Sequence, residues 1–240
     1  MSSSATVAEQ ARNLGARALA LAGDLALQAS RRLMEGDSQG SLRGDRWIEW
    51  SFCLARLADG PGTTLDFGSD TGFLALAAAQ RGHDVVALDR LPPTLDYRHE
   101  RVNPVQADIL DQPLSDRRFD QIVNCSSVEH VGLAGRYGSG DEPEGDLVAM
   151  AILRDMLQRD GRMILTIPVG QDLLCPPLHR IYGPRRLPAL LDSYHIDEEQ
   201  YWHRDRGAKA WMRADRDLAL KTVGSRAFYS LGLFVLRPNA

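Results

Sequence analysis

The stretch at residues 63–81 constrains the fold most, because it places a strand, a glycine turn and a helix in direct succession. Thr63–Phe67 predicts a buried strand and Phe73–Arg81 an alanine-rich helix, which Gly82 ends. Further strands, separated by helical stretches such as Gly145–Gln158, are predicted at Asp84–Asp89, Val102–Gln106, Phe119–Cys125 and Arg162–Pro168. This alternation predicts an α/β fold, in which a mostly parallel sheet carries helices on both faces.

Two further segments flank this alternation. Before it, residues 5–34 carry apolar side chains at helical spacing and Arg46–Ala58 predicts a second helix, so we expect residues 1–62 to form a helical cover. After it, a polar, helix-like segment precedes a last strand at Tyr229–Leu236, whose direction stays open. We predict a single domain over residues 1–240: the cover at 1–62, the core at 63–168, and a loop, helices and closing strand at 169–240.

Composition excludes several classes of protein. The longest uninterrupted apolar runs, Phe73–Ala79 and Leu147–Leu153, are far shorter than the about 20 residues of a membrane-spanning helix. No signal peptide is expected at the N-terminus. The net charge of -4 argues against sequence-independent binding of nucleic acid. The 3 cysteines lack CxxC spacing, which favours a reducing, cytoplasmic compartment and argues against a zinc site.

The turn in LDFGSDTGF has the composition of a ligand-binding loop. Gly68 and Gly72 allow the backbone to approach a ligand closely and to present the amides of a helix N-terminus. A dinucleotide fingerprint requires glycines at positions 68, 70 and 73, but the last two positions hold Asp70 and Phe73. The Asp70 carboxylate would repel a pyrophosphate but not a ligand with an ammonium or sulfonium group. The turn therefore disfavours NAD and FAD.

Three aspartates follow three successive predicted strands. Asp66, Asp89 and Asp108 each stand where a parallel strand ends, and the carboxyl edge of an open α/β sheet is where ligands bind. Any one of them alone is equally well explained as the cap of a turn or helix. As a set, they predict a nucleoside site, with Asp89 accepting hydrogen bonds from ribose hydroxyls and Asp108 contacting the adenine amino group.

With this turn and these acids, the chain resembles the class I S-adenosylmethionine-dependent methyltransferases over about residues 63–168. The resemblance implies a seven-stranded Rossmann-like sheet, with Tyr229–Leu236 as its antiparallel strand, and S-adenosylmethionine as the cofactor. It also implies that Asp66 faces the methionine end, through water. The chain departs from the family at Asp70, where a middle glycine is usual. The cofactor-binding residues implied are Asp66, Gly68, Ser69, Asp70, Gly72, Asp89, Arg90, Asp108, Ile109 and Cys125.

The segment after the fourth predicted strand, CSSVEHVGL, holds the candidates for the reaction. In the fold that the resemblance implies, this strand end faces the methyl group. A hydroxyl acceptor must lose its proton, and a histidine that titrates near neutrality suits that task. His130 is therefore the candidate base, and Glu129 would orient it or contact the substrate. The alternative is that both residues cap the following turn.

The long glycine-rich loop at Glu129–Asp146 is a candidate for contact with the acceptor. We expect Arg136 and Tyr137 to close over the acceptor. The acidic residues of this loop suggest a metal site, but a solvated acidic loop or a helix cap explains them better, so we expect no metal.

A second loop, Pro168–Gly183, brings together a base, a guanidinium and a phenol in His179, Arg180 and Tyr182, which are further candidates for acceptor binding. A salt-bridged loop anchor is the alternative for the first two. The motifs EHVGL, RYG and HRIYG resemble a poorly characterised methyltransferase-like branch that accompanies carbohydrate or natural-product assembly.

That resemblance points to a small-molecule acceptor, a sugar or polyol hydroxyl, by analogy. The chain is acidic before His179 and basic after it, which suggests an anionic or sugar-linked acceptor. The tryptophans near the C-terminus suggest core or homodimer contacts. Two alternatives stay open: an N-methyltransferase acting on a small amine, and a non-catalytic S-adenosylmethionine-binding protein, the latter suggested by Asp70. A nucleotide-dependent oxidoreductase is disfavoured by the missing third glycine.

Overall fold

The computed structural model describes residues 44–92, 94–133 and 141–239. These residues belong to one compact unit that spans Leu42–Ala240. The helix expected around residues 5–34 and two of the candidate acceptor residues, Arg136 and Tyr137, lie outside the described residues.

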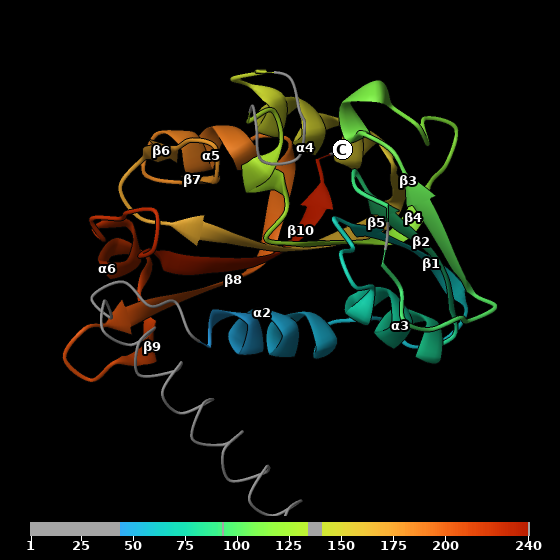
Figure 1. The fold of residues 1–240 in the computed structure, drawn as a ribbon, viewed down its shortest axis with the longest axis horizontal. Helices are drawn as coiled ribbons and strands as arrows, with labels where there is room; N and C mark the ends of the chain where they lie inside the picture. Colours follow the sequence, from blue (N-terminus) through green and yellow to red (C-terminus); the bar gives the residue numbers. More distant parts are fainter. Residues whose placement is uncertain (1–43, 93, 134–140, 240) are drawn as a thin grey trace, which may run out of the picture. The chain divides into compact units, whose positions relative to one another are not determined.

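An eight-stranded sheet forms the centre of this unit (Figure 1), in the order β3-β2-β1-β4-β5-β10-β8-β9. The strands are β1 Gly62–Phe67, β2 His83–Asp89, β3 Val102–Gln106, β4 Phe119–Cys125, β5 Leu157–Val169, β8 Tyr194–Asp205, β9 Ala210–Ala214 and β10 Ser230–Pro238. The five strands from β3 to β5 pair in parallel. β10 then pairs antiparallel with both β5 and β8, and β9 antiparallel with β8.

The predicted α/β fold with a mostly parallel sheet is confirmed, and the direction of the last strand is settled as antiparallel. The expected strand count of seven is wrong, because residues 194–214 form the hairpin β8–β9 and not a polar helix-like segment. This hairpin lies at the sheet edge, and most of its side chains are exposed or half-buried. The alternation of buried and exposed residues that identifies a strand is therefore weak in its sequence.

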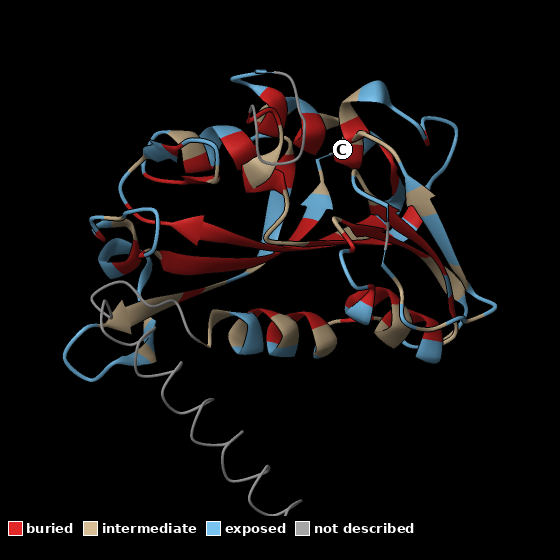
Figure 2. Ribbon diagram, viewed as in Figure 1, coloured by how far each residue is buried: buried red, intermediate tan, exposed pale blue. Residues whose placement is uncertain are grey.

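Helices pack on both faces of the sheet (Figures 1 and 2). They are α2 Asp45–Leu54, α3 Phe73–Gln80, α4 Gly145–Asp155, α5 Arg186–Leu191 and α6 Arg216–Leu220, with short 3-10 turns at η2 Ile109–Asp111 and η3 Val128–His130. Two hydrophobic cores result. On one face, α2 and α3 pack against strand residues such as Val85 and Ala87. On the other, α4 and α5 pack against their neighbours Val86 and Leu88, because successive strand residues point to opposite faces.

A small second sheet holds the hairpin of β6 Leu173–Cys175 and β7 His179–Ile181. β7 packs against η3 and β5, so this hairpin lies beside the loop that leaves β4. Among the described helices, none is long and apolar enough to cross a membrane. The three cysteines, all within the described residues, are free thiols.

Candidate functional site

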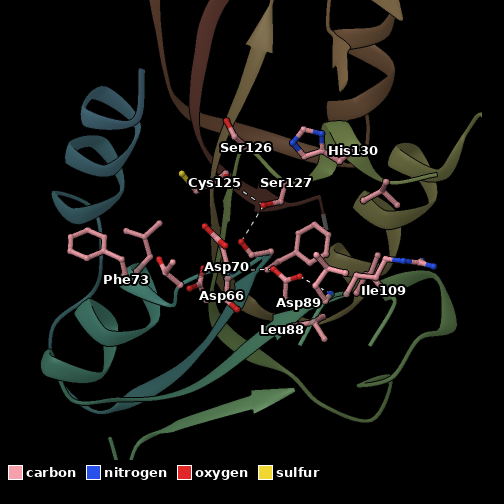
Figure 3. Close-up of a pocket in the computed structure, with 18 of the residues that line it drawn as sticks. Asp66, Asp70, Phe73, Leu88, Asp89, Ile109, Cys125, Ser126, Ser127 and His130 are labelled. Carbon is pink, nitrogen blue, oxygen red and sulfur yellow. Dashed lines mark hydrogen bonds between the residues drawn. The ribbon is translucent and has the colours of Figure 1, made fainter. Parts of the chain in front are cut away.

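A cavity of about 600 Å³ lies at the carboxyl ends of β1, β2 and β4 (Figure 3). Its described lining comes from α2, the glycine turn, the ends of β2 and β3, and the segment after β4, all between Arg46 and Gly132. Of the cofactor-binding residues expected from the sequence, those that line it are Asp66, Gly68, Ser69, Asp70, Asp89, Arg90, Asp108, Ile109 and Cys125. Gly72, the second glycine of the turn, is not among the residues that line the cavity.

The glycine turn carries the chain from β1 into α3 across the end of β2. The amides of Gly68 and Ser69 donate to the carbonyl oxygen of Leu88, at 2.8 and 3.2 Å. Gly68 has φ +72°, and a Cβ there would lie 2.1 Å from Oγ and 2.5 Å from Cβ of Ser127. Only glycine allows the turn and the segment after β4 to approach this closely.

Substituting alanine for Gly68 is expected to lower the free energy of unfolding by about 2–5 kcal/mol, the sum of a left-handed backbone penalty and a core overlap. The overlap cannot be relieved by rotating the serine side chain alone, because its Cβ is also too close. Urea unfolding would measure the loss. Gly60, which also has a positive φ but has nothing within 4 Å of an added Cβ, provides the matched control. Equal losses for both alanine variants would contradict a steric requirement at Gly68.

Asp70 stands where the resemblance leads one to expect a glycine, and it has a left-handed backbone conformation. Its φ is +48°, within the left-handed region that aspartate tolerates better than most residues. Its amide donates to Oδ2 of Asp89, at 3.0 Å. The unusual residue is therefore compatible with the turn, and its backbone ties the turn to the end of β2.

The two acids after β2 and β3 differ in how they are held. Asp89 accepts hydrogen bonds from the amides of Asp70 and Leu91, one on each carboxylate oxygen. Asp108 accepts from the amide of Leu110 at 3.0 Å, which caps η2, and forms an ion pair with Arg90. Asp108 thus serves as a cap and also lines the cavity.

Asp66 is buried where β1 ends, below the turn. Burial raises its pKa to about 7, against the effect of a hydrogen bond from the Ala75 amide and together with repulsion from Asp89. Within the described part of the chain, its Oδ2 and the hydroxyl of Ser69 are buried without a hydrogen-bond partner. Because buried polar atoms are normally satisfied, these two atoms on the cavity wall fit the polar end of a ligand.

On the other side of the cavity, the segment after β4 presents Cys125, Ser126, Ser127 and His130 (Figure 3). Nδ1 of His130 donates to the carbonyl oxygen of Leu178, at 2.5 Å. A carbonyl can only accept, so Nδ1 carries the proton and the neutral ring keeps its lone pair on Nε2. The loop between β6 and β7 thereby orients the candidate base.

Glu129 is buried, and it is not among the cavity-lining residues. Its Oε1 lies 3.8 Å from Nε2 of His130. Burial raises its pKa to about 8, and repulsion from Glu49 adds to the rise. The expected pairing of Glu129 with His130 is thus present in space, while Glu129 has no place in the described cavity wall.

The structure places His179, Arg180 and Tyr182 outside the cavity wall, although the sequence made them candidates for acceptor binding. The Arg180 guanidinium is buried and donates to the carbonyl oxygens of Val131 and Pro143. The Tyr182 hydroxyl donates to Asp146, at 3.1 Å. Arg180 thus anchors the loop after η3, which is the alternative that the sequence left open. No basic residue after His179 is part of the described lining, so the expectation of an anionic acceptor gains no support.

Three residues of α2 belong to the site and were missed from the sequence: Arg46 and Trp50 line the cavity, and Glu49 is buried behind it. The Trp50 ring packs against Phe73, with ring centroids 4.8 Å apart. A signal was present, because Glu49 stands between apolar residues at positions 48 and 50 of an otherwise hydrophobic helix. Within the described ranges, no cluster of three or more His, Cys, Asp or Glu side chains could hold a metal ion.

Comparison with solved structures identifies the fold as that of the class I methyltransferases. The crystal structure of Burkholderia thailandensis 1,6-didemethyltoxoflavin-N1-methyltransferase with S-adenosylhomocysteine matches with a TM-score of 0.53, 18% identity and coverage of 94% of this chain and 90% of that chain. The N-methyltransferase NodS from Bradyrhizobium japonicum WM9 matches with a TM-score of 0.57, 15% identity and coverage of 82% and 89%.

The CcbJ methyltransferase from Streptomyces caelestis matches with a TM-score of 0.53, 17% identity and coverage of 80% and 89%. No curated protein matches the chain. One family model does match, over residues 68–209, and its description is "Caenorhabditis protein of unknown function, DUF268". Because that match covers more than half of the sequence, the chain belongs to the DUF268 family, and it carries the class I methyltransferase fold.

Proposed function

We propose that the chain is an S-adenosylmethionine-dependent methyltransferase that acts on a hydroxyl group of a small molecule. The observation that carries the proposal is one cavity in which the Gly68 turn, the carboxylate of Asp89 and the oriented imidazole of His130 come together. The chain's resemblance to a branch associated with carbohydrate and natural-product assembly supports a sugar, polyol or natural-product intermediate as the acceptor.

The residues of the cavity fit S-adenosylmethionine better than a dinucleotide. Asp89 and Asp108, with Ile109 beside them, would hold the adenosine. The unpartnered oxygen of Asp66 and the hydroxyl of Ser69 would bind the polar methionine end. Asp70 adds a negative charge at the same turn, which favours a cationic ligand over a pyrophosphate. When bound, S-adenosylmethionine supplies an electrophilic methyl group on its sulfonium.

His130 would remove the acceptor's proton. Its Nε2 bears the lone pair, and the Leu178 carbonyl fixes the ring so that this lone pair keeps one orientation. The charge of the resulting imidazolium is stabilised by the same carbonyl. Holding the acceptor oxygen in line with the methyl group is the other contribution that the cavity wall makes, because alignment accounts for much of the acceleration of a displacement.

The state of Asp66 makes cofactor affinity depend on pH. Its pKa is raised to about 7, so the carboxyl is neutral at lower pH and loses its attraction for an ammonium group. Between pH 5 and pH 7 we expect the Kd for S-adenosylmethionine to decrease with rising pH, by up to about tenfold per unit, and then to level off. Calorimetry across this range would measure it. Asp66→Asn should give weak binding that does not vary with pH, and a pH-independent Kd in the unmodified chain would contradict this role.

The proposed reaction is tested by incubating the full chain with S-adenosylmethionine labelled on its methyl group. The acceptor panel would contain sugar nucleotides, free sugars and polyols, together with small amines of similar size. Label recovered on a hydroxyl compound is the expected result. Transfer to amines alone would overturn the choice of oxygen, and binding of the cofactor with no transfer to any acceptor would favour the non-catalytic alternative.

A further inference from the structure

Two buried acids lie behind the part of the cavity wall that Ser126 and His130 form. Glu49 comes from α2 and Glu129 from η3, and their side chains are 98% buried or more. Ser126, at the end of β4, contacts the first of them and is part of the cavity wall. The described residues around the two carboxylates supply a single cation near Glu49, that of Arg46.

Burial raises the pKa of Glu49, and three groups act against that rise. The hydroxyls of Ser126 and Thr166 both donate to its Oε1, the latter at 2.9 Å. An Arg46 guanidinium nitrogen lies 3.2 Å from Oε2. Both oxygens are therefore engaged by donors. Such a set of donors stabilises the charged form of a carboxylate that burial alone would neutralise.

Glu129 lacks comparable support. Its Oε2 is buried without a partner among the described residues. Among the described residues, only Glu49 of the two acids forms an ion pair with an arginine. Two neighbouring buried carboxylates cannot both ionise at low cost, so the pair keeps one proton, and that proton belongs on the acid with fewer donors. The backbone of Ser126, next to this pair, has φ +50°, and strained conformations of this kind cluster at functional sites.

One acid of the pair, Glu129, lies next to the proposed base, His130. Oε1 of Glu129 lies 3.8 Å from Nε2 of His130, so an ionised Glu129 would stabilise the imidazolium that forms when the base takes a proton. A protonated Glu129 offers no such charge. The protonation of Glu129 thus controls how strong a base His130 can be.

We propose that Glu49, the acid of the pair with more donors, is a positioning residue whose negative charge keeps Glu129 protonated, and that it so sets the pH above which His130 becomes the stronger base. Above that pH Glu129 is ionised, the acceptor's proton moves to Nε2 of His130, and the Glu129 carboxylate balances the charge of the imidazolium. The inference rests on the proposed function in assigning His130 as the base. It adds a second acid, Glu49, which is buried behind the cavity wall.

The pKa of Glu129, raised to about 8 mainly by burial, agrees with this assignment. Its own backbone amide, Arg46 and Ser126 lower that pKa, and Glu49 raises it. On the side of β7 and β10, the groups near Glu129 and His130 are Tyr182, Tyr229, His179 and Arg180. Burial raises the pKa of both tyrosines, so they stay neutral near pH 8.

The experiment follows the ring resonances of His130 by NMR in the full chain, labelled at histidine, from pH 5 to pH 10. His130→Gln would assign the signal among the 6 histidines. We expect an inflection at about pH 8 that reports the ionisation of Glu129. Glu129→Gln should abolish that inflection, and Glu49→Gln should move it at least one pH unit lower, because the repelling charge is gone.

Arg46→Met gives a second test that does not depend on burying a new amide, since this side chain is 47% exposed. Loss of the cation should move the inflection upward, opposite to the effect of Glu49→Gln. Glu100→Gln, an exposed acid in the turn before β3, is the matched control and should not move it. An inflection that survives in Glu129→Gln, or that stays in place in both the Glu49 and Arg46 variants, overturns the proposal.

Titration with S-adenosylmethionine in the same samples separates this inference from the proposed function. Absence of binding, with the inflections shifting as expected, would refute the methyltransferase proposal while leaving the coupled acids established. Normal binding with inflections that do not shift would refute the coupling alone.

Discussion

Replacing His130 by alanine is expected to lower kcat by about 10²–10⁴-fold, while the Kd for S-adenosylmethionine is unchanged. The imidazole lines the cavity and is the proposed base, and the 2.5 Å hydrogen bond from Nδ1 to Leu178 leaves the lone pair of the neutral ring on Nε2. In the proposed site, the cofactor is bound by other residues, those of the turn and the ends of β2 and β3. The substitution should therefore lower kcat and leave Kd unchanged.

Methyl transfer to the hydroxyl acceptor found in the panel, measured with the label at saturating cofactor, would give kcat, and calorimetry would give Kd. His195→Ala is the matched control, because this histidine lies exposed on β8, beside Asp197. Equal losses in kcat and affinity would show that His130 is structural. An undiminished kcat would indicate an acceptor that needs no base, such as a neutral amine.

Replacing Asp89 by alanine is expected to raise the Kd for S-adenosylmethionine by about 100-fold or more. The proposed bonds from its carboxylate to two ribose hydroxyls are charge-assisted and contribute about 1.5–3 kcal/mol each. The same carboxylate accepts from the amides of Asp70 and Leu91, so the shape of the turn is lost together with the ligand contacts.

The comparison is made with Asp84→Ala at the opposite end of the same strand, where the carboxylate is exposed and pairs with Arg101. This control should bind the cofactor as the unmodified chain does. If Asp89→Ala bound S-adenosylmethionine with unchanged affinity and retained its fold by circular dichroism, the ribose would have to bind elsewhere.

The parallel half of the sheet is predictable from the sequence because most of its strands, β1, β2, β4 and β5, are largely buried apolar runs. Val102–Gln106 and Phe119–Cys125 match the predicted ranges to the residue. The edge hairpin is not predictable in this way, because the side chains of Tyr194–Asp205 are mostly exposed or half-buried and its charged residues follow no strict alternation. β8 lies between β10 and the edge strand β9, so the hairpin becomes evident only when its pairing with β10 is known.

Of the candidate site too, the local features are predictable from the sequence and the contacts between distant residues are not. The glycine turn and the acids that follow the strands are local features, and the structure brings Asp66, Asp89 and Asp108 to one cavity as expected. The pairing of Glu49 with Thr166 joins residues that are 117 positions apart and leaves no local pattern. For His179 and Arg180 the local motif suggested acceptor binding. Their side chains instead contact His130 and the carbonyl oxygen of Val131, at η3 and just after it.

The central claim is that this cavity binds S-adenosylmethionine, and calorimetric titration of the full chain with S-adenosylmethionine tests it most directly. NAD, titrated in parallel, serves as the competing ligand that the turn at Asp70 should exclude. We predict saturable one-to-one binding of S-adenosylmethionine and no measurable heat with NAD. Binding of NAD, or no binding of S-adenosylmethionine by the folded chain at pH 8, would contradict the account.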